Sequence, residues 1–243
     1  MRLADLRSRL MQLWPAADQD TPPPLPGLPE LASAGDDGTA TGTLAAPATR
    51  WTAERIAVAD QLWGDGHVLP GGEEEVLRLA VPLGLSEASS LLMLGAAAGG
   101  PARSVVTGLG PWISGHEADP SLAALAAWRL PRAGKLVAKR ATVAAWNPQA
   151  PVFRRHGFNH ALALEALRGA PGQPVSMAEL LVALAGALRP GGPLVLVDLV
   201  ATGRLDPTDP VVRAWAEVEG RTPSCRPKPA CPALLPAWAS MCG

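Results

Sequence analysis

Residues 89–103 of the chain read SSLLMLGAAAGGPAR, an apolar run that leads into small residues and then a proline. The apolar run is typical of a buried strand, and proline is common in the first turn of a helix. Residues without bulk let another molecule approach the backbone, and the first amides of a helix have no partners inside it. The pattern therefore predicts a strand, a tight cofactor loop and a helix start. A buried strand followed by an ordinary glycine-rich turn is the alternative.

The composition is that of a folded protein with almost no net charge. The chain has 243 residues, 48% of them hydrophobic, and a formal net charge of -1. This length can hold one domain with a full core. A net charge so close to zero creates no field that attracts nucleic acid or anionic lipid, so we expect neither as a partner. No apolar run is long enough to span a membrane, and the amino end lacks the apolar core of a secretory signal. We therefore expect a cytoplasmic protein.

Three regions are expected along the chain. Residues 1–50 combine a short amphipathic helix at 1–14 with a flexible linker rich in proline, alanine and glycine. In the simpler interpretation this helix packs on its own domain or frays, and in the other it docks on a partner or a membrane surface. Residues 51–221 form the folded domain. For residues 222–243 two interpretations stay open, a disordered tail and a terminus altered by a shift of reading frame.

No metal site is expected. Cys225, Cys231 and Cys242 lie near the carboxyl end at spacings that match no common zinc pattern, and their odd number argues against a disulfide framework. The four histidines do not stand at ligand spacing from a cysteine or a carboxylate.

Helical and strand patterns alternate between residues 51 and 221. The expected helices cover 54–63 with Thr52 as its cap, 73–83, 101–108, 120–130, 177–188 with Ser176 as its cap, and 211–219. In the first of them Ile56, Ala59, Leu62 and Trp63 share one face. The expected strands lie at 89–94, at 112–117, within 136–146, within 158–164 and at 194–200. This alternation indicates a parallel sheet covered on both faces, so the predicted fold class is α/β, doubly wound and Rossmann-like.

Two polar residues end the strands that follow the loop. Ligands bind at the carboxyl ends of an open parallel sheet, near the switch in strand order. Glu117 ends the second strand 22 positions after Gly95, where a carboxylate can accept hydrogen bonds from two ribose hydroxyls of an adenosyl ligand. Asn147 closes the third strand, where its side-chain amide can face an adenine ring.

The order of these features resembles the class I S-adenosylmethionine-dependent methyltransferases. The most specific signal is Leu-Arg-Pro-Gly-Gly at 188–192, which ends a helix before a strongly apolar strand. Residues 62–72, LWGDGHVLPGG, resemble the segment that closes over the cofactor in the branch of phosphoethanolamine and other small-amine methyltransferases. The resemblance covers 51–221 and implies S-adenosylmethionine as the cofactor and a small molecule as the acceptor. It also implies seven strands, of which five can be placed, so we expect the last strands to be missing.

The resemblance implies a role for each residue that matches its motifs. The residues implied in cofactor binding are Gly95, Ala97 and Gly99 in the loop, Glu117 at the ribose, Asn147 near the adenine, and Gly71 and Gly72 near the methionine part.

Three positions depart from the family pattern. Met93 replaces an acid, Ala97 replaces a glycine, and Asn159 replaces an aspartate. Ala97 costs about 1 kcal/mol if its backbone needs a positive φ. Met93 removes a possible partner for the ammonium group of the ligand. These departures imply weakened cofactor binding or lost catalysis.

Candidates for acid–base chemistry are few. Methyl transfer of this type needs little of it, because the sulfonium carries its own leaving group. His67 lies in the segment expected to cover the pocket and is a candidate acid or base, with a solvated loop histidine as the alternative. Glu165 follows the fourth strand, where it can face a substrate amine or start a helix at the surface. The acids at 73–75 are expected to form a solvated first turn, with at most one facing a pocket.

Three functions remain open. The first is an S-adenosylmethionine-dependent methyltransferase that acts on a small molecule by direct displacement. The second is a non-catalytic protein of the same fold that binds or scaffolds, motivated by Met93, Ala97 and Asn159. The third is an NAD(P)-dependent oxidoreductase, because the loop and the later acid loosely match that fingerprint, although the loop lacks its middle glycine. The sequence does not indicate the oligomeric state.

Overall fold

The computed structural model describes residues 51–167, 175–201, 206–218 and 226–227, all within the unit Thr43–Gly243. The helix and linker predicted for 1–50, the cysteines and most of the predicted tail lie outside the described residues. No described helix is both long enough and apolar enough to cross a membrane.

Helices and strands alternate through the described residues, as the sequence predicts. The helices are α2 (Ala53–Trp63), α3 (Gly72–Ala80), α4 (Gly100–Leu109), α5 (Pro120–Arg129), α6 (Lys135–Arg140), α7 (Met177–Ala187) and α8 (Pro210–Val218), with single 3-10 turns η1 (Val81–Leu83) and η2 (Leu130–Arg132). The strands are β1 (Ser90–Leu94), β2 (Trp112–Glu117), β3 (Ala141–Ala145), β4 (His160–Leu164), β5 (Leu194–Val197), β6 (Val200–Ala201) and β7 (Arg226–Pro227).

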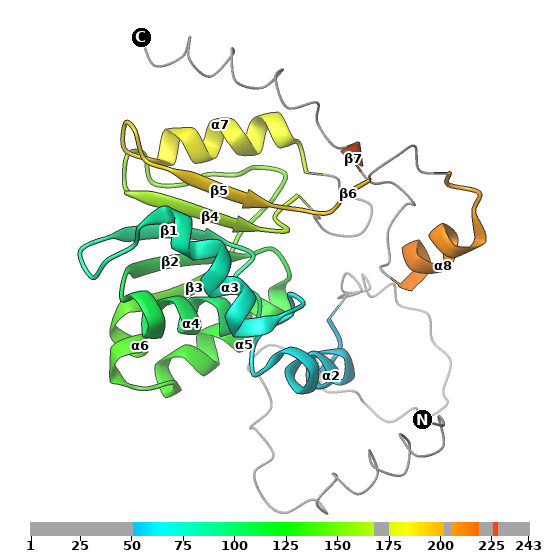
Figure 1. Cartoon of the computed structure of the whole chain (residues 1–243), viewed down its shortest axis with the longest axis horizontal. Coiled ribbons are helices and arrows are strands. Elements are labelled where there is room, and N and C mark those ends of the chain that lie inside the picture. Colours follow the sequence, from blue (N-terminus) through cyan, green and yellow to red (C-terminus); the bar gives the residue numbers. More distant parts are fainter. Residues whose placement is uncertain (1–50, 168–174, 202–205, 219–225, 228–243) are drawn as a thin grey trace, which may run out of the picture. The chain divides into compact units, whose positions relative to one another are not determined.

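The main sheet has five parallel strands in the order β3-β2-β1-β4-β5 (Figure 1). In register, Leu94 of β1 stands between His116 of β2 and Ala163 of β4. The strand order reverses between β1 and β4, and open α/β sheets bind ligands at such a switch point. The predicted doubly wound α/β fold is confirmed. β6 and β7 form a separate two-stranded sheet.

Alternate residues of β1 face two separate hydrophobic cores. Leu91 and Met93 are fully buried in a core that includes residues of α3 and α4. Leu92 and Leu94 are fully buried in a core that includes residues of α7. A strand covered on both faces has this alternation, so both sides of the sheet centre are shielded from water.

Side-chain caps begin the helices where the sequence predicts. The Thr52 hydroxyl accepts the Arg55 N–H at 3.3 Å, and the Ser176 hydroxyl accepts the Glu179 N–H at 3.4 Å. The Asp119 carboxylate accepts the amides of Ser121 and Leu122 at the start of α5. These bonds satisfy amides that have no partner within the helix.

Three details differ from the sequence-based expectation. The helix expected at 73–83 ends at Ala80 and tightens into η1, because Pro82 has no N–H for an α-helical hydrogen bond. Leu62 was expected on the buried face of α2, but it is 64% exposed. The strand within 136–146 is preceded by α6, a helix that the pattern did not reveal.

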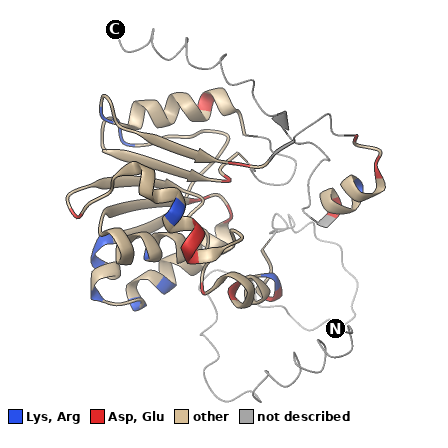
Figure 2. Ribbon diagram, in the orientation of Figure 1, with Lys and Arg blue, Asp and Glu red and all other residues tan. Residues whose placement is uncertain are grey.

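Charge and a local contact stabilise α6. Its last turn holds Lys139 and Arg140, and Figure 2 shows basic residues in blue on the helices around α6. Cations are favourable at the carboxyl end of a helix, where carbonyl groups lack partners. The Arg140 guanidinium also donates to the Gly110 carbonyl, so this short helix is fastened to the turn between α4 and β2.

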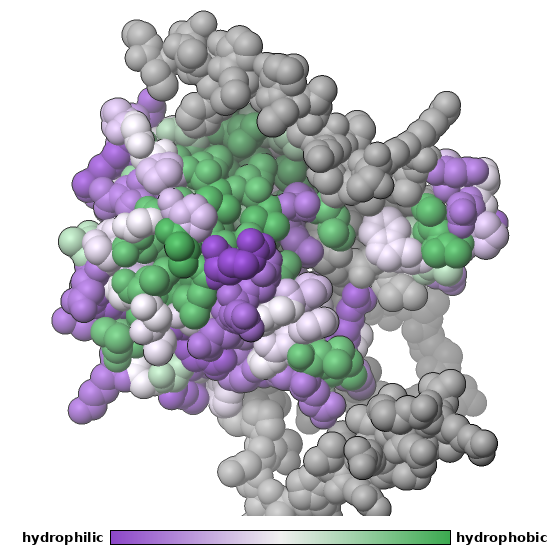
Figure 3. Space-filling model, in the orientation of Figure 1, coloured by the Kyte–Doolittle hydropathy of each residue, from purple (hydrophilic) through white to green (hydrophobic). Residues whose placement is uncertain are grey.

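One edge of the sheet is apolar and partly open. Every residue of β5 is partly exposed, and β5 lies at one edge of the main sheet, with β3 at the other, among the described strands. Hydrophobic side chains gather over β4 and β5 on the face drawn in Figure 3. Val81 in η1, which contacts β5, is 63% exposed. Among the described residues, the main sheet contains only the five strands that the sequence places.

Candidate functional site

The loop from Gly95 to Gly99 joins β1 to α4 at the switch point and is bonded to the end of β2. The His116 carbonyl accepts the Gly95 N–H at 3.0 Å and the Ala96 N–H at 3.3 Å. The Gly99 N–H donates to the Ala96 carbonyl at 3.0 Å and closes the turn. The loop is therefore held by the strand that ends in Glu117.

The backbone of this loop needs left-handed conformations. Gly95 has φ +71°, and a Cβ placed there would lie 2.0 Å from the Leu164 carbonyl oxygen. Gly99 has φ +94°, and its Cβ would press against Leu130. Ala97 has φ 51°, so the strain that the sequence analysis made conditional is present. The missing side chains at Gly95 and Gly99 thus make room for protein atoms rather than for a ligand.

The Glu117 side chain is 8% exposed and is oriented by two backbone amides. Its Oε2 accepts the Ala97 N–H at 2.8 Å, and its Oε1 accepts the Asp119 N–H at 3.0 Å. Burial raises the pKa of Glu117 and the nearby Asp119 charge adds to the rise, while the amides of Asp119, Ala97 and Ala118 oppose it. Each carboxylate oxygen has more than one acceptor position, so the group can still receive a hydroxyl on each oxygen.

An aromatic group gathers around the His116 side chain, which points to the opposite face of β2 from the Glu117 side chain. The rings of His116 and Phe153 are 5.3 Å apart, and those of Trp146 and Phe153 are 5.7 Å apart. The Trp146 backbone N–H donates to the Glu117 carbonyl at 3.1 Å, so this hydrogen bond joins two main chains and does not involve the indole ring. Among the described residues, the buried His116 Nδ1 and Trp146 Nε1 have no hydrogen-bond partner. This group could not be predicted from the sequence, because nothing in the local pattern brings His116, Trp146 and Phe153 together.

Asn147 lies in an exposed turn directly after Trp146. Its Oδ1 accepts the Gln149 N–H at 3.0 Å, and its carbonyl accepts the Ala150 N–H at 3.1 Å. These described contacts stay within its own turn. The role of Asn147 near an adenine therefore stays a prediction.

Two of the departures from the family pattern have clear structural places. Met93 is fully buried in β1, within the core that includes α3 and α4. Asn159 accepts the Ser90 N–H at 3.0 Å and the Ser90 hydroxyl at 2.8 Å, at the amino ends of β4 and β1. Asn159 thus joins two strands by hydrogen bonds. Because the amino ends of the strands are opposite the loop, Asn159 lies away from the candidate cofactor site.

The predicted segment at 62–72 packs on the start of α4. The Gly66 carbonyl accepts the Gly100 N–H at 3.0 Å, and a Cβ on Gly66 would lie 2.9 Å from the Ala98 carbonyl oxygen. Gly72 is buried, and its Cβ would lie 2.1 Å from the Trp63 carbonyl oxygen. Gly71 is exposed at the start of α3. The described contacts explain both α3 glycines through local packing, and their approach to a cofactor stays a prediction.

His67 is 1% exposed, so its interpretation as a solvated loop residue is wrong. Its Nε2 lies 3.1 Å from the Ser104 hydroxyl, which donates to Glu73 Oε2 at 3.1 Å. Burial lowers the pKa of His67 and the Arg103 charge lowers it further, against the carbonyls of Gly64 and Asp65 and the Glu73 charge. Of the three acids in the first turn of α3, Glu73 therefore faces a buried group.

Two carboxylates follow β4, which pairs with β1, and β5, which lies beyond β4. Glu165 comes directly after β4 and is partly buried, with φ 48° and its N–H donating to the Val197 carbonyl at 2.7 Å. Asp198 comes directly after β5, and its carboxylate accepts the amides of Leu167 and Leu199. Asp198 is not among the site residues predicted from the sequence, although an acid directly after the most apolar strand is a visible signal.

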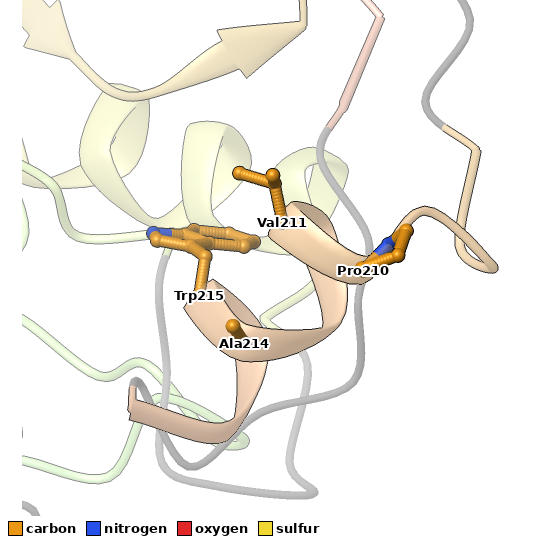
Figure 4. Close-up of a pocket in the computed structure, with 4 residues that line it drawn as sticks. All are labelled: Pro210, Val211, Ala214 and Trp215. Carbon is orange, nitrogen blue, oxygen red and sulfur yellow. The ribbon is translucent and has the colours of Figure 1, made fainter.

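A surface hollow lies elsewhere. It has a volume of 560 Å³ and is lined by four residues of α8, namely Pro210, Val211, Ala214 and Trp215 (Figure 4). Its described lining comes from one helix and includes no titratable group, so we place the candidate site at the loop and Glu117. Among the described residues, no group of three or more His, Cys, Asp or Glu side chains is arranged to hold a metal ion.

Solved structures share this fold at low sequence identity. A phosphoethanolamine N-methyltransferase 2 from Haemonchus contortus, in complex with phosphomonomethylethanolamine and S-adenosylhomocysteine, is similar with a TM-score of 0.62 and 17% identity. The similarity covers 80% of this chain and 41% of that chain, so this chain spans less than half of that relative.

A second similar structure is assigned as a sarcosine dimethylglycine methyltransferase from Galdieria sulphuraria. Its TM-score is 0.54 at 18% identity, over 70% of this chain and 60% of that chain. No protein-family model and no curated protein sequence matches the chain. Together with the strand order, the structural similarities establish that the chain has the Rossmann-like fold of class I methyltransferases.

Proposed function

We propose that the protein binds S-adenosylmethionine and transfers its methyl group to a small-molecule acceptor. The observation that carries the proposal is the buried Glu117 carboxylate, bonded to the loop amide of Ala97 at the carboxyl ends of β1 and β2. A carboxylate preoriented by amides, with acceptor positions left on both oxygens, suits two ribose hydroxyls. The similar phosphoethanolamine N-methyltransferase 2 from Haemonchus contortus forms complexes with S-adenosylhomocysteine and with S-adenosylmethionine, which supports the same cofactor here.

The chain's residues would mainly bind and align. When bound, the cofactor supplies an electrophilic methyl group with its own leaving group. Glu117 would hold the ribose, and the loop from Gly95 to Gly99 would present the backbone. Gly95 packs against the Leu164 carbonyl. Glu165, the next residue after Leu164, is the proposed contact for the methyl acceptor. Alignment in a water-poor site is the main requirement of such a displacement.

Calorimetric titration of the full chain with S-adenosylmethionine and S-adenosylhomocysteine tests the cofactor. We expect saturable heat for both, and binding about 10–100-fold weaker in Glu117→Gln, because hydrogen bonds to the charged oxygens are lost. Glu87→Gln is the matched control, since its carboxylate is 82% exposed beside Arg140 and should leave binding unchanged. Folded protein that gives no heat with either ligand at millimolar concentration would exclude the proposal.

Transfer of a labelled methyl group tests catalysis. The relatives' names suggest amine acceptors, so the first panel is phosphoethanolamine, sarcosine and dimethylglycine. We expect Glu165→Gln to raise the KM for the acceptor and to leave the affinity for S-adenosylhomocysteine unchanged. Cofactor binding without transfer to this panel or to a small-molecule extract would favour the non-catalytic alternative.

A further inference from the structure

Two backbones meet where the turn at residues 64–67 touches the start of α4. A Cβ on Gly100 would lie 2.5 Å from both the Gly66 carbonyl carbon and His67 Nδ1. Non-bonded heavy atoms do not approach so closely, so only a glycine at position 100 leaves room for the turn. The Gly66 carbonyl accepts the Gly100 N–H, which follows Gly99 at the end of the candidate cofactor loop. The position of the turn therefore sets the position of the loop's last residue.

The His67 side chain fastens this turn to α4. Ser104 lies one helical turn after Gly100, and both His67 and Ser104 are 1% exposed. The Ser104 hydroxyl has a single proton, which it donates to the Glu73 carboxylate. The imidazole must then donate its Nε2 proton to the Ser104 oxygen at 3.1 Å. A directed chain of hydrogen bonds thus runs from His67 through Ser104 to the carboxylate on α3.

We propose that His67 is a positioning residue for the cofactor loop, acting through Ser104 and Gly100. This inference rests on the proposed function for the identity of the ligand. His67 Nδ1 is buried among the described residues and faces the Gly100 backbone. The imidazole therefore packs against the protein side of the loop and does not contact the methyl acceptor. Removing the chain of bonds should let the turn move away from Gly100 and loosen Ala97, whose amide orients Glu117.

The test compares His67→Gln with His67→Asn. A glutamine amide reaches the position of the imidazole Nε2 and can donate to Ser104, whereas an asparagine amide reaches only the position of Nδ1. We expect His67→Asn to bind S-adenosylhomocysteine about tenfold more weakly than the parent chain, the effect of one lost buried hydrogen bond. His67→Gln should recover to within about threefold. Each variant is first checked for cooperative thermal unfolding.

Hydrogen exchange of residues 95–104 gives a readout that needs no ligand. We expect faster exchange there in His67→Asn, parent-like exchange in His67→Gln, and no local change in the control His160→Asn. His160 is the first residue of β4, at the end of the strands opposite the loop, where it pairs with Leu91. If His67→Asn does not fold, Ser104→Ala breaks the same chain from α4 and should produce the same local exchange.

Parent-like binding and exchange in a folded His67→Asn chain would overturn the proposal. Equal weakening by His67→Gln and His67→Asn would overturn it too, since the bond to Ser104 would then have no role. If the parent chain does not bind S-adenosylhomocysteine, the proposed function fails, and the exchange of residues 95–104 still decides whether His67 positions the loop.

Discussion

At the scale of single residues, Gly95 and Ala97 both have a positive φ in one loop, but they differ in their tolerance of a methyl group. Gly95→Ala should lower the free energy of unfolding by about 2–4 kcal/mol, because its methyl would meet the Leu164 carbonyl at a left-handed φ. Ala97→Gly should change it by no more than about 1 kcal/mol, since relief of strain at φ 51° is offset by the greater freedom of glycine in the unfolded chain. Urea unfolding of both variants measures the difference.

The two substitutions change the same loop by one methyl group each, so each serves as the control for the other. Equal stability losses would contradict the prediction, because they would mean that the loop adjusts to a side chain at either position.

The raised pKa of Glu117 predicts that cofactor binding depends on pH. Ribose hydroxyls donate to the ionised carboxylate, so binding favours ionisation and releases a proton. As pH falls through the raised pKa, which burial and the Asp119 charge cause, S-adenosylhomocysteine should bind more weakly. Calorimetry between about pH 5 and pH 8, in buffers of different ionisation enthalpy, measures both affinity and proton release.

The isosteric variant Glu117→Gln controls the pH experiment. It should bind weakly at every pH and release no proton, because its amide does not titrate in this range. A parent chain whose affinity is independent of pH would show that Glu117 is not the group that receives the ligand.

Single residues differ in how far the sequence reveals them. The resemblance to the family indicates that Ala97 replaces a loop glycine, which made a positive φ there a condition to test, and the observed φ of 51° meets it. The burial of His67 does not follow from the sequence, because its partner Ser104 is 37 positions away on another element. A histidine among glycines has the same local pattern whether it is solvated or packed.

At the scale of elements, Arg129 of α5 joins α2 to the turn that follows it. Its guanidinium donates to both carboxylate oxygens of Asp60, at 2.6 and 3.2 Å, and it also pairs with Asp65 at 3.2 Å. The Arg129 and Asp60 side chains are only 19% and 23% exposed. Arg129→Ala should therefore lower the free energy of unfolding by about 1–2 kcal/mol and speed hydrogen exchange at residues 60–67.

Arg132→Ala is the matched control for this prediction. Arg132 lies three positions after Arg129, in η2, where its guanidinium covers the Trp128 ring and donates to the Trp128 carbonyl. Among the described residues it forms no ion pair with an acid. Its loss should cost less and leave residues 60–67 unchanged. Equal effects of the two variants would mean that the Asp60 contact adds nothing to the joining of α2 and α5.

The elements themselves are largely legible in the sequence. The strand expected at 112–117 is β2, and the helix expected at 177–188 is α7, one residue shorter at its end. Long apolar periodicity and capping side chains carry these predictions. α6 escaped notice because its six residues are too few to show a period. Leu62 was misplaced because helical spacing predicts a shared face but not that another element covers it.

At the scale of the whole molecule, the alternation of elements predicts a parallel sheet, but the order of its strands comes from the structure. Nothing in the pattern distinguishes β3-β2-β1-β4-β5 from another doubly wound order. The strand order decides which strands are neighbours. Because β2, β1 and β4 are adjacent, Glu117, Gly95 and Glu165 lie together at the carboxyl ends of these strands. Long-range pairings of this kind lie beyond local periodicity, so the fold class was more accessible than the aromatic group around Phe153.

Three partly or wholly buried histidines predict that acid destabilises the chain. Burial lowers the pKa of His67, His116 and His160, and the Arg103 charge contributes at His67. The unfolded chain, with an ordinary histidine pKa of about 6.5, then binds more protons than the folded chain. The stability from keeping these imidazoles neutral is present above that pKa and is lost as pH falls below it. The free energy of unfolding, measured in urea, should therefore decrease between about pH 7 and pH 5.

The contribution of each histidine follows from its non-titrating variant. His160→Gln and His116→Gln should each flatten the pH dependence, and the largest flattening is expected for His67→Gln, because His67 is the most buried of the three. Glu117 acts in the opposite sense, since its raised pKa makes the folded chain take up a proton more readily than the unfolded one, so its effect opposes the loss of stability toward pH 5. A pH dependence that survives all three substitutions would place the acid-sensitive groups outside these imidazoles and contradict the prediction.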